Sequence, residues 1–243
     1  MTPTTTRVSV QVNHGRHQVR TTAGLLRAQR VHGPPDRARV ALVGQTALLL
    51  GGDEVRLDLE VGSGAHLELS DVAGTVAYHG RGRSASWHVT VRVGAGGRLR
   101  YRGEPLVISD GADVTRTLQV DLADGATARL RETVVFGRAG ERGGRLDSSL
   151  LLRRDHREFS RERLRLDAES RARPGLLAGV RLVDSVLQLG PPPREGAGAG
   201  DLPISGYGSS SSERPDVTTY ALLDSGSTIT RFLGTSPAAS PLR

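Results

Sequence analysis

The sequence predicts a mainly β fold in which antiparallel and repeated strands stack into a β-helical, solenoid-like structure with one or two short helices. One phrase, an alternating strand followed by a Gly-containing turn and a second alternating strand, recurs at residues 59–69, 91–101 and 120–130. Alternation of apolar and polar residues with period two is typical of half-buried strands. The turns hold Gly64, Gly96 and Gly125, where a chain reversal requires positive φ. Recurrence at a near-regular spacing predicts copies that bury their apolar faces against one another.

The strands outside the repeats follow from the same alternation. Residues 8–20 predict a hairpin that turns at 13–15, because Asn and Gly tolerate the backbone conformation of a tight turn. An alternating strand at 55–61 leads into the first repeat, and strands at 87–93 and 114–122 lead into the others. Each repeat therefore receives its own incoming strand.

The last third of the chain is more varied. Strands at 146–153 and 159–167 flank a turn at 155–156, and a second hairpin joins 219–223 to 228–233. Residues 175–190 have apolar residues at three- and four-residue spacing, which favours a helix, although their β-branched content suits a strand as well. Residues 191–215 are rich in Pro, Gly and Ser, a composition that predicts a flexible loop within one domain.

Composition limits the classes of function. The chain has 243 residues and no Cys, which excludes disulfides, thiolate metal ligands and Cys nucleophiles and fits a reducing compartment. The net charge is +7, and all 33 basic residues are Arg. Because these arginines alternate with apolar residues and aromatic residues are scarce, nucleic-acid binding is not favoured. The sequence shows no targeting segment and no run long enough to span a bilayer, so we expect a cytoplasmic protein without membrane partners.

A search for catalytic motifs finds none. The sequence has no phosphate-cradling loop ending in G-K-[ST], no G-x-S-x-G and no H-E-x-x-H. His14 and His17 form an H-x-x-H pair, but no Cys or carboxylate lies near them, so a solvated loop is favoured over a metal site. Glu132 lies between Arg131 and an apolar run. Its side chain is expected either to form a buried ion pair or to lie on the surface, and the sequence favours neither. We therefore predict that the chain is not an enzyme.

Several segments resemble those of one known family. The Gly51-Gly52-Asp53 turn, the strand that follows it and the repeated V-G-x-G-A-x-L phrases look like segments of the urease accessory proteins called UreD, or UreH in some species. The segment at 75–78 is similar to the family's T-K-V-Y segment, with Val76 in the position of the lysine.

Later segments extend the resemblance over nearly the whole chain. Residues 104–112 resemble the family's P-x-x-x-I-x-x-x-G-A region, and 228–234 resemble its R-x-L-G segment. Residues 132–138 are similar to its W-[DE]-x-x-x-x-G-R phrase, with Arg131 where Trp is typical. The replaced Lys and Trp and the insert at 191–215 are departures from the family pattern, which leave open a divergent copy with a specialised role.

The resemblance implies a single UreD-like β domain over residues 1–243 that acts as a non-enzymatic chaperone. Members of the family bind apo-urease and a helical accessory protein of the UreF type, and a GTPase of the UreG type joins them and supplies nickel. The resemblance thus implies no stably bound cofactor and Ni²⁺ in transit through an internal polar tunnel. Such a passage needs oxygen or imidazole ligands of modest affinity, so that the ion can leave again.

The family-like motifs supply the candidate residues. The candidates for tunnel or transient-ligand positions are Asp53, Tyr78, Glu104, Asp110 and Glu132. The candidates for shaping turns or an interface are Gly51, Gly52, Gly137 and Arg138. An alternative remains open for the whole chain, a β-solenoid module without enzymatic activity that uses its arginines to bind an acidic protein or a polyanion.

Overall fold

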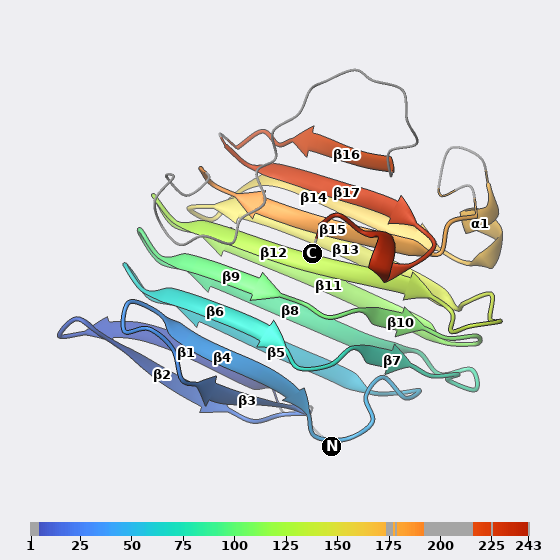
Figure 1. Ribbon diagram of the computed structural model, residues 1–243, viewed down its shortest axis with the longest axis horizontal. Coiled ribbons are helices and arrows are strands. Elements are labelled where there is room, and N and C mark those ends of the chain that lie inside the picture. Colours follow the sequence, from blue (N-terminus) through green and yellow to red (C-terminus); the bar gives the residue numbers. More distant parts are fainter. Residues whose placement is uncertain (1–4, 174–176, 178, 192–215, 225, 243) are drawn as a thin grey trace.

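Two sheets packed face to face form the structure, a computed structural model that describes residues 5–173, 177, 179–191, 216–224 and 226–242. The first sheet has the order β14 (Arg157–Leu166), β13 (Arg145–Arg154), β11 (Asp113–Leu122), β8 (Ala85–Val93), β5 (Glu54–Val61), β1 (Thr6–Asn13) and β2 (Arg16–Thr22). Apart from the hairpins at the two ends of the stack, the strands are stacked in the order of the chain from blue to red (Figure 1).

The second sheet runs alongside the first. Its order is β16 (Asp216–Ala221), β17 (Thr228–Gly234), β15 (Leu182–Leu189), β12 (Thr127–Phe136), β9 (Arg98–Arg102), β6 (His66–Asp71), β4 (Ala38–Gly44) and β3 (Leu26–Val31). The short strands β7 (Thr75–Ala77) and β10 (Leu106–Ile108) extend it beside β12. One α-helix, α1 (Ala168–Ala172), and a 3₁₀ turn, η1 (Pro237–Ala239), complete the described elements.

The predicted repeats are the coils of a β-solenoid, so the predicted fold class is confirmed. In each repeat one strand lies in the first sheet and the next in the second, and equivalent strands of successive repeats pair in parallel. Gly64, Gly96 and Gly125 have φ values of 65°, 64° and 64°. The turns stack as well, because the Gly64 amide donates to the Ala95 carbonyl at 2.9 Å.

The three predicted hairpins are present. β1 pairs antiparallel with β2, β13 with β14, and β16 with β17. The helix favoured for residues 175–190 is wrong for 182–189, which form β15 between β12 and β17. Nearly every residue of β15 is buried, because neighbouring structure covers both of its faces, and alternation is lost from the sequence of such a strand. Residues 175, 176 and 178, and 192–215 of the predicted loop, lie outside the described part of the chain.

The core fills the space between the two sheets. Leu57 and Leu59 of one sheet and Leu67 and Leu69 of the other are almost fully buried. Leu, Val and Ala make up most of this core, which agrees with the low aromatic content of the sequence. Among the described residues no helix has the length and apolar character needed to cross a membrane.

Candidate functional site

A row of polar side chains crosses the apolar core between the two sheets. Within the second sheet the register aligns Glu132 of β12 with Ser185 of β15, and Ser185 with Arg231 of β17. Across the core, the register of the first sheet aligns Trp87 of β8 with Arg116 of β11, and Arg116 with Ser148 of β13. We call this set, which Asp71, Tyr101 and Glu162 extend, the interior polar row. It runs perpendicular to the strands, along the direction in which the repeats stack.

An ion pair between Arg116 and Glu132 joins the two sheets at the middle of the row. The guanidinium Nη2 donates to Glu132 Oε1. Their side chains are only 14% and 17% exposed. Burial opposes the charge on Arg116, but the adjacent Glu132 carboxylate raises the pKa of that guanidinium above its ordinary value. A buried charge without its partner is costly, so the two residues hold one another in place.

Two small cavities lie on either side of this pair. Arg116 and Glu132 contribute to the walls of both. The cavity toward the N-terminal strands has a volume of about 30 Å³ and is also lined by Asp71, Trp87 and Tyr101. The other has about 50 Å³. Each is large enough for water, and the ion pair separates them.

Asp71 is the most perturbed carboxyl group of the row. Its Oδ1 accepts a hydrogen bond from the Tyr101 hydroxyl at 3.1 Å, and its Oδ2 accepts one from the Glu104 amide at 3.1 Å. Burial raises the pKa of Asp71 to about 6. Burial, and then the neighbouring Asp71, raise the pKa of Tyr101 well above its ordinary value. Asp71 is therefore mostly ionised at neutral pH and able to take up a proton in mild acid.

The rest of the row is also polar. The Trp87 indole Nε1–H is buried without a hydrogen-bond partner among the described residues, although a buried donor normally has one. Trp87 lines the same cavity as Asp71. At the other end Arg231 Nη2 donates to Glu162 Oε1 at 2.5 Å, which forms a second ion pair between the sheets.

The predicted residues Asp53, Tyr78, Asp110, Gly137 and Arg138 lie elsewhere. They occupy the loops at one edge of the stack, on the right in Figure 1, where the loops before β5 and after β7, β10 and β12 succeed one another. The loops are joined through the backbone, because the Tyr78 amide donates to the Leu49 carbonyl and the Gly137 amide to the Ile108 carbonyl. We call this row of loops the loop edge.

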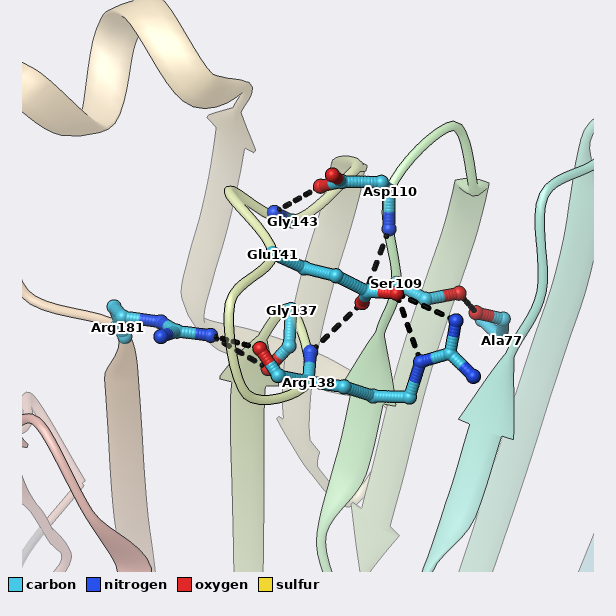
Figure 2. A network of polar contacts seen from close by, with 8 residues as sticks. All are labelled: Ala77, Ser109, Asp110, Gly137, Arg138, Glu141, Gly143 and Arg181. Atoms are coloured by element: carbon cyan, nitrogen blue, oxygen red, sulfur yellow. Dashed lines mark hydrogen bonds and ion pairs between the residues drawn. The ribbon is translucent and has the colours of Figure 1, made fainter.

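Figure 2 shows how the last part of the loop edge is held together. Glu141 Oε2 accepts from the Arg138 amide at 2.8 Å, and Arg138 Nε donates to Glu141 Oε1 at 2.8 Å. The Arg138 guanidinium lowers the pKa of Glu141 to about 2. Asp110 Oδ1 accepts from the Gly143 amide at 2.6 Å. Arg181 Nη2 donates to the carbonyls of Gly137 and Arg138.

Glycines allow the loops to approach closely. Gly137 has φ 79°, and a Cβ added there would lie 2.8 Å from the Glu141 carbonyl oxygen. Gly51 packs against the backbone of Gly80, and a Cβ on Gly51 would lie 2.5 Å from the Gly80 carbonyl oxygen. Gly52 has φ 96°. Asp53 Oδ2 accepts from the Leu50 amide at 2.9 Å and so closes its own turn.

Of the five candidates for tunnel positions, the structure brings only Glu104 and Glu132 together. Both line the cavity beside Asp71, whereas Asp53, Tyr78 and Asp110 lie on the loop edge. Within the described part of the chain, no three His, Asp or Glu side chains converge as a metal centre would require.

The comparison with protein families decides where this fold belongs. The family model described as the UreD urease accessory protein matches residues 5–240. The chain belongs to the UreD family. A UreD protein of Streptomyces griseus, named urease accessory protein UreD 1, is 46% identical over 159 residues, which cover 65% of this chain and 62% of that protein. One from Streptomyces coelicolor, named urease accessory protein UreD, is 37% identical over 69% of this chain and 68% of that protein.

The similarity to other UreD proteins leaves part of their length unmatched. A UreD 1 protein of Saccharopolyspora erythraea is 42% identical over 60% of this chain and 58% of that protein. The chain thus matches about three fifths of the lengths of the Streptomyces griseus and Saccharopolyspora relatives.

Sequence reasoning missed most of the interior polar row. It did not select Asp71, Tyr101 or Arg116, nor the pair of Glu162 and Arg231. A signal was present, because Arg116 stands between Val114 and Leu118 in the apolar phase of its strand. Asp71 follows Leu67 and Leu69 in the same way. A charged residue in the apolar phase of a strand points into the core.

Proposed function

We propose that this chain is a non-catalytic urease maturation factor, a scaffold that binds apo-urease and a UreF-type accessory protein and helps to deliver Ni²⁺ to urease. The match of the UreD family model over residues 5–240 is the observation that supports this proposal most strongly. The names of the relatives describe an accessory role in urease biogenesis. Recruitment of a UreG-type GTPase belongs to the same proposal, and so does a cytoplasmic location.

The interior polar row is the proposed route of the nickel cargo. Carboxylate oxygens bind divalent first-row metals with lower affinity than thiolates, which suits an ion that must be released. Asp71, Glu104 and Glu132 supply such oxygens around one cavity. No stable metal centre is needed for this role, since each carboxylate would hold the ion only briefly.

The two arginines of the row determine how an ion could advance. A guanidinium repels Ni²⁺, and Arg116 and Arg231 each lie against a carboxylate of the row. Passage therefore requires that the ion take the place of the arginine at the carboxylate while the guanidinium moves aside. The Arg116–Glu132 pair separates the two cavities, so in this proposal it is the point at which passage is controlled.

The test is reconstitution of urease maturation with a full accessory set. The chain is co-expressed with a UreF-type protein, a UreG-type GTPase and the urease subunits, and the assembly is purified on a tag on this chain. After addition of nickel and GTP, urease activity and the nickel content of urease are measured. Asp71→Asn and Glu132→Gln are compared with Glu169→Gln, whose side chain on α1 is 84% exposed.

The scaffold and the route make separate predictions. We expect activation only when this chain is present, and we expect both interior variants to assemble normally while urease gains at least tenfold less nickel. Glu169→Gln should behave as the wild type. Activation without this chain would refute the scaffold. Normal nickel loading by both interior variants would refute the route alone.

A further inference from the structure

The N-terminal end of the stack carries a groove that the proposed nickel route does not use. β2 is the last strand of one sheet and β3 the last strand of the other, at the dark-blue end of Figure 1. The groove has a volume of about 920 Å³ and is formed by residues 15–20 of the β1–β2 hairpin together with 30–35, Arg37 and Arg39. We call it the basic groove.

The charge of the basic groove has one sign. Its lining includes five arginines and two histidines and no carboxylate: Arg16, Arg20, Arg30, Arg37, Arg39, His17 and His32. Arg37 and Arg39 lie 2.8 and 3.3 Å from Glu68. Arg16, Arg20 and Arg30 are exposed, and none of them makes an ion pair with the described residues. Three cations are therefore available to a ligand.

Protection of a sheet edge does not explain this charge. Edge strands often carry charges that prevent pairing with other chains, and charges of either sign serve that purpose. The opposite edge of the same sheet, β14, mixes both signs, and its arginines Arg161 and Arg163 pair with Glu158 and Asp147. In the basic groove Arg37 and Arg39 are compensated by Glu68, but Arg16, Arg20 and Arg30 have no such partner among the described residues, which is typical of a surface that meets a complementary charge.

The groove also offers the features that bind an extended chain. Among the described residues β2 pairs with β1 on one side only, so its other edge presents backbone donors and acceptors. Along β2, Arg16, Gln18 and Arg20 share one face, and successive side chains on such a face are about 7 Å apart. Val19 is half-buried and Val31 is 43% exposed, which provides apolar contact between the charges.

We propose that the basic groove binds an extended acidic segment of a partner protein, added as a strand beside β2. Carboxylates at alternate positions of that segment would pair with Arg16 and Arg20, and others would reach Arg30 from the opposite side. Arg is suited to this because its planar fork binds a carboxylate through two hydrogen bonds. Binding of such a segment requires neither urease nor nickel.

Direct binding to the purified chain tests the proposal. The probe is a fluorescent ten-residue peptide of repeated Glu-Glu-Val, which presents Glu on both faces of a strand, and its counterpart has Lys in place of every Glu. Anisotropy titrations at two salt concentrations compare the wild type with Arg20→Gln/Arg30→Gln and Arg20→Glu/Arg30→Glu. The control is Arg157→Glu, an exposed change at the first residue of β14 on the far edge of the sheet. Circular dichroism checks that each variant is folded.

We expect the Glu peptide to bind the wild type and the control equally and the charge-reversed variant at least tenfold more weakly, with the neutral variant between them. Hydrogen exchange of β2 should slow when the Glu peptide is bound. The proposal is overturned if the Glu peptide does not bind, or if the Lys peptide binds with the same affinity. It is also overturned if both Arg20/Arg30 variants bind the Glu peptide as tightly as the wild type does. Tighter binding of a ten-residue oligothymidylate through the same arginines would assign the groove to a polyanion instead.

Discussion

Replacement of Asp71 by Asn should remove a specific pH dependence from the stability of the protein. Asp71 is a partly buried carboxyl group whose pKa is raised from 3.8 to about 6 by its position between the sheets. Between these two values the folded chain holds more protons than the unfolded chain, so the free energy of unfolding falls as the pH rises. Asp71 therefore destabilises the fold above pH 6 and has no such effect below about pH 4.

The magnitude follows from the two pKa values. A change of the pKa from 3.8 to about 6 lowers the free energy of unfolding by about 3 kcal/mol in total as the pH rises. About 2 kcal/mol of this loss falls between pH 4.5 and 7.5. The variant loses the carboxylate oxygen that accepts from the Glu104 amide, at a cost of about 1 kcal/mol at any pH. We expect Asp71→Asn to be about as stable as the wild type at pH 4.5, where ionisation has already removed about 1 kcal/mol from the wild type, and about 2 kcal/mol more stable at pH 7.5.

Urea unfolding at several pH values measures this difference. Trp87 is the only Trp of the chain and lines the same cavity as Asp71, so its fluorescence reports both unfolding and the titration of the carboxyl group. Asp113→Asn, at the first residue of β11, is the control and should keep the pH dependence of the wild type. If Asp71→Asn and the wild type differ by the same free energy at pH 4.5 and 7.5, the reasoning is refuted.

Three further predictions concern pairs and close approaches, each measured by urea unfolding. Glu132→Gln leaves the Arg116 guanidinium unpaired and should lower the free energy of unfolding by about 3 kcal/mol. The double variant Arg116→Met/Glu132→Leu removes both charges and should recover most of that loss. A Glu132→Gln variant as stable as the wild type would contradict this. Asp184→Ala should cost about 3 to 5 kcal/mol, because this fully buried carboxylate accepts hydrogen bonds from two side chains of β12 and from one near the C-terminus. Gly137→Ala should lower the free energy of unfolding by at least about 2 kcal/mol more than Gly140→Ala. Both glycines have positive φ, but of the two only Gly137 has backbone atoms within 3 Å of an added Cβ. Equal losses of stability would exclude the steric explanation.

The coils of the solenoid could be predicted because each one carries its own signal. In the repeats one face of each strand is buried and the other exposed, so alternation marks the strand and a glycine with positive φ marks the turn. β15 carries no such signal, because its two faces are covered by different parts of the chain and it is apolar almost throughout. Its antiparallel partners β12 and β17 come from residues 127–136 and 228–234, and no local pattern of 182–189 identifies them.

The candidate residues were harder to predict because they gather from separate repeats. Glu104 and Glu132 were selected through family-like motifs, and the structure places both at one cavity. The same motifs also selected Asp53 and Asp110 of the loop edge, whose carboxylates accept hydrogen bonds from a backbone amide of their own turn and of a neighbouring loop, respectively. Asp71 and Arg116 lie 45 positions apart in the chain, and only the stacking of coils brings them to one cavity.

The interior polar row and the basic groove both contain charged residues at strand positions where the alternation is otherwise apolar. Arg116 and Glu132 stand in the apolar phase in the middle of the stack, where neighbouring coils cover them and each charge needs its partner. Arg30 follows Leu26 and Ala28 at the same apolar position of the alternation on β3, but β3 is the last strand of its sheet, and no coil of the described residues covers it. A charged residue at such a position needs an ion-pair partner inside the stack, whereas at the end of the stack it stays exposed to solvent. An acidic strand, as proposed for the basic groove, would supply Arg30 with the counter-charge that a neighbouring coil supplies to Arg116 inside the stack.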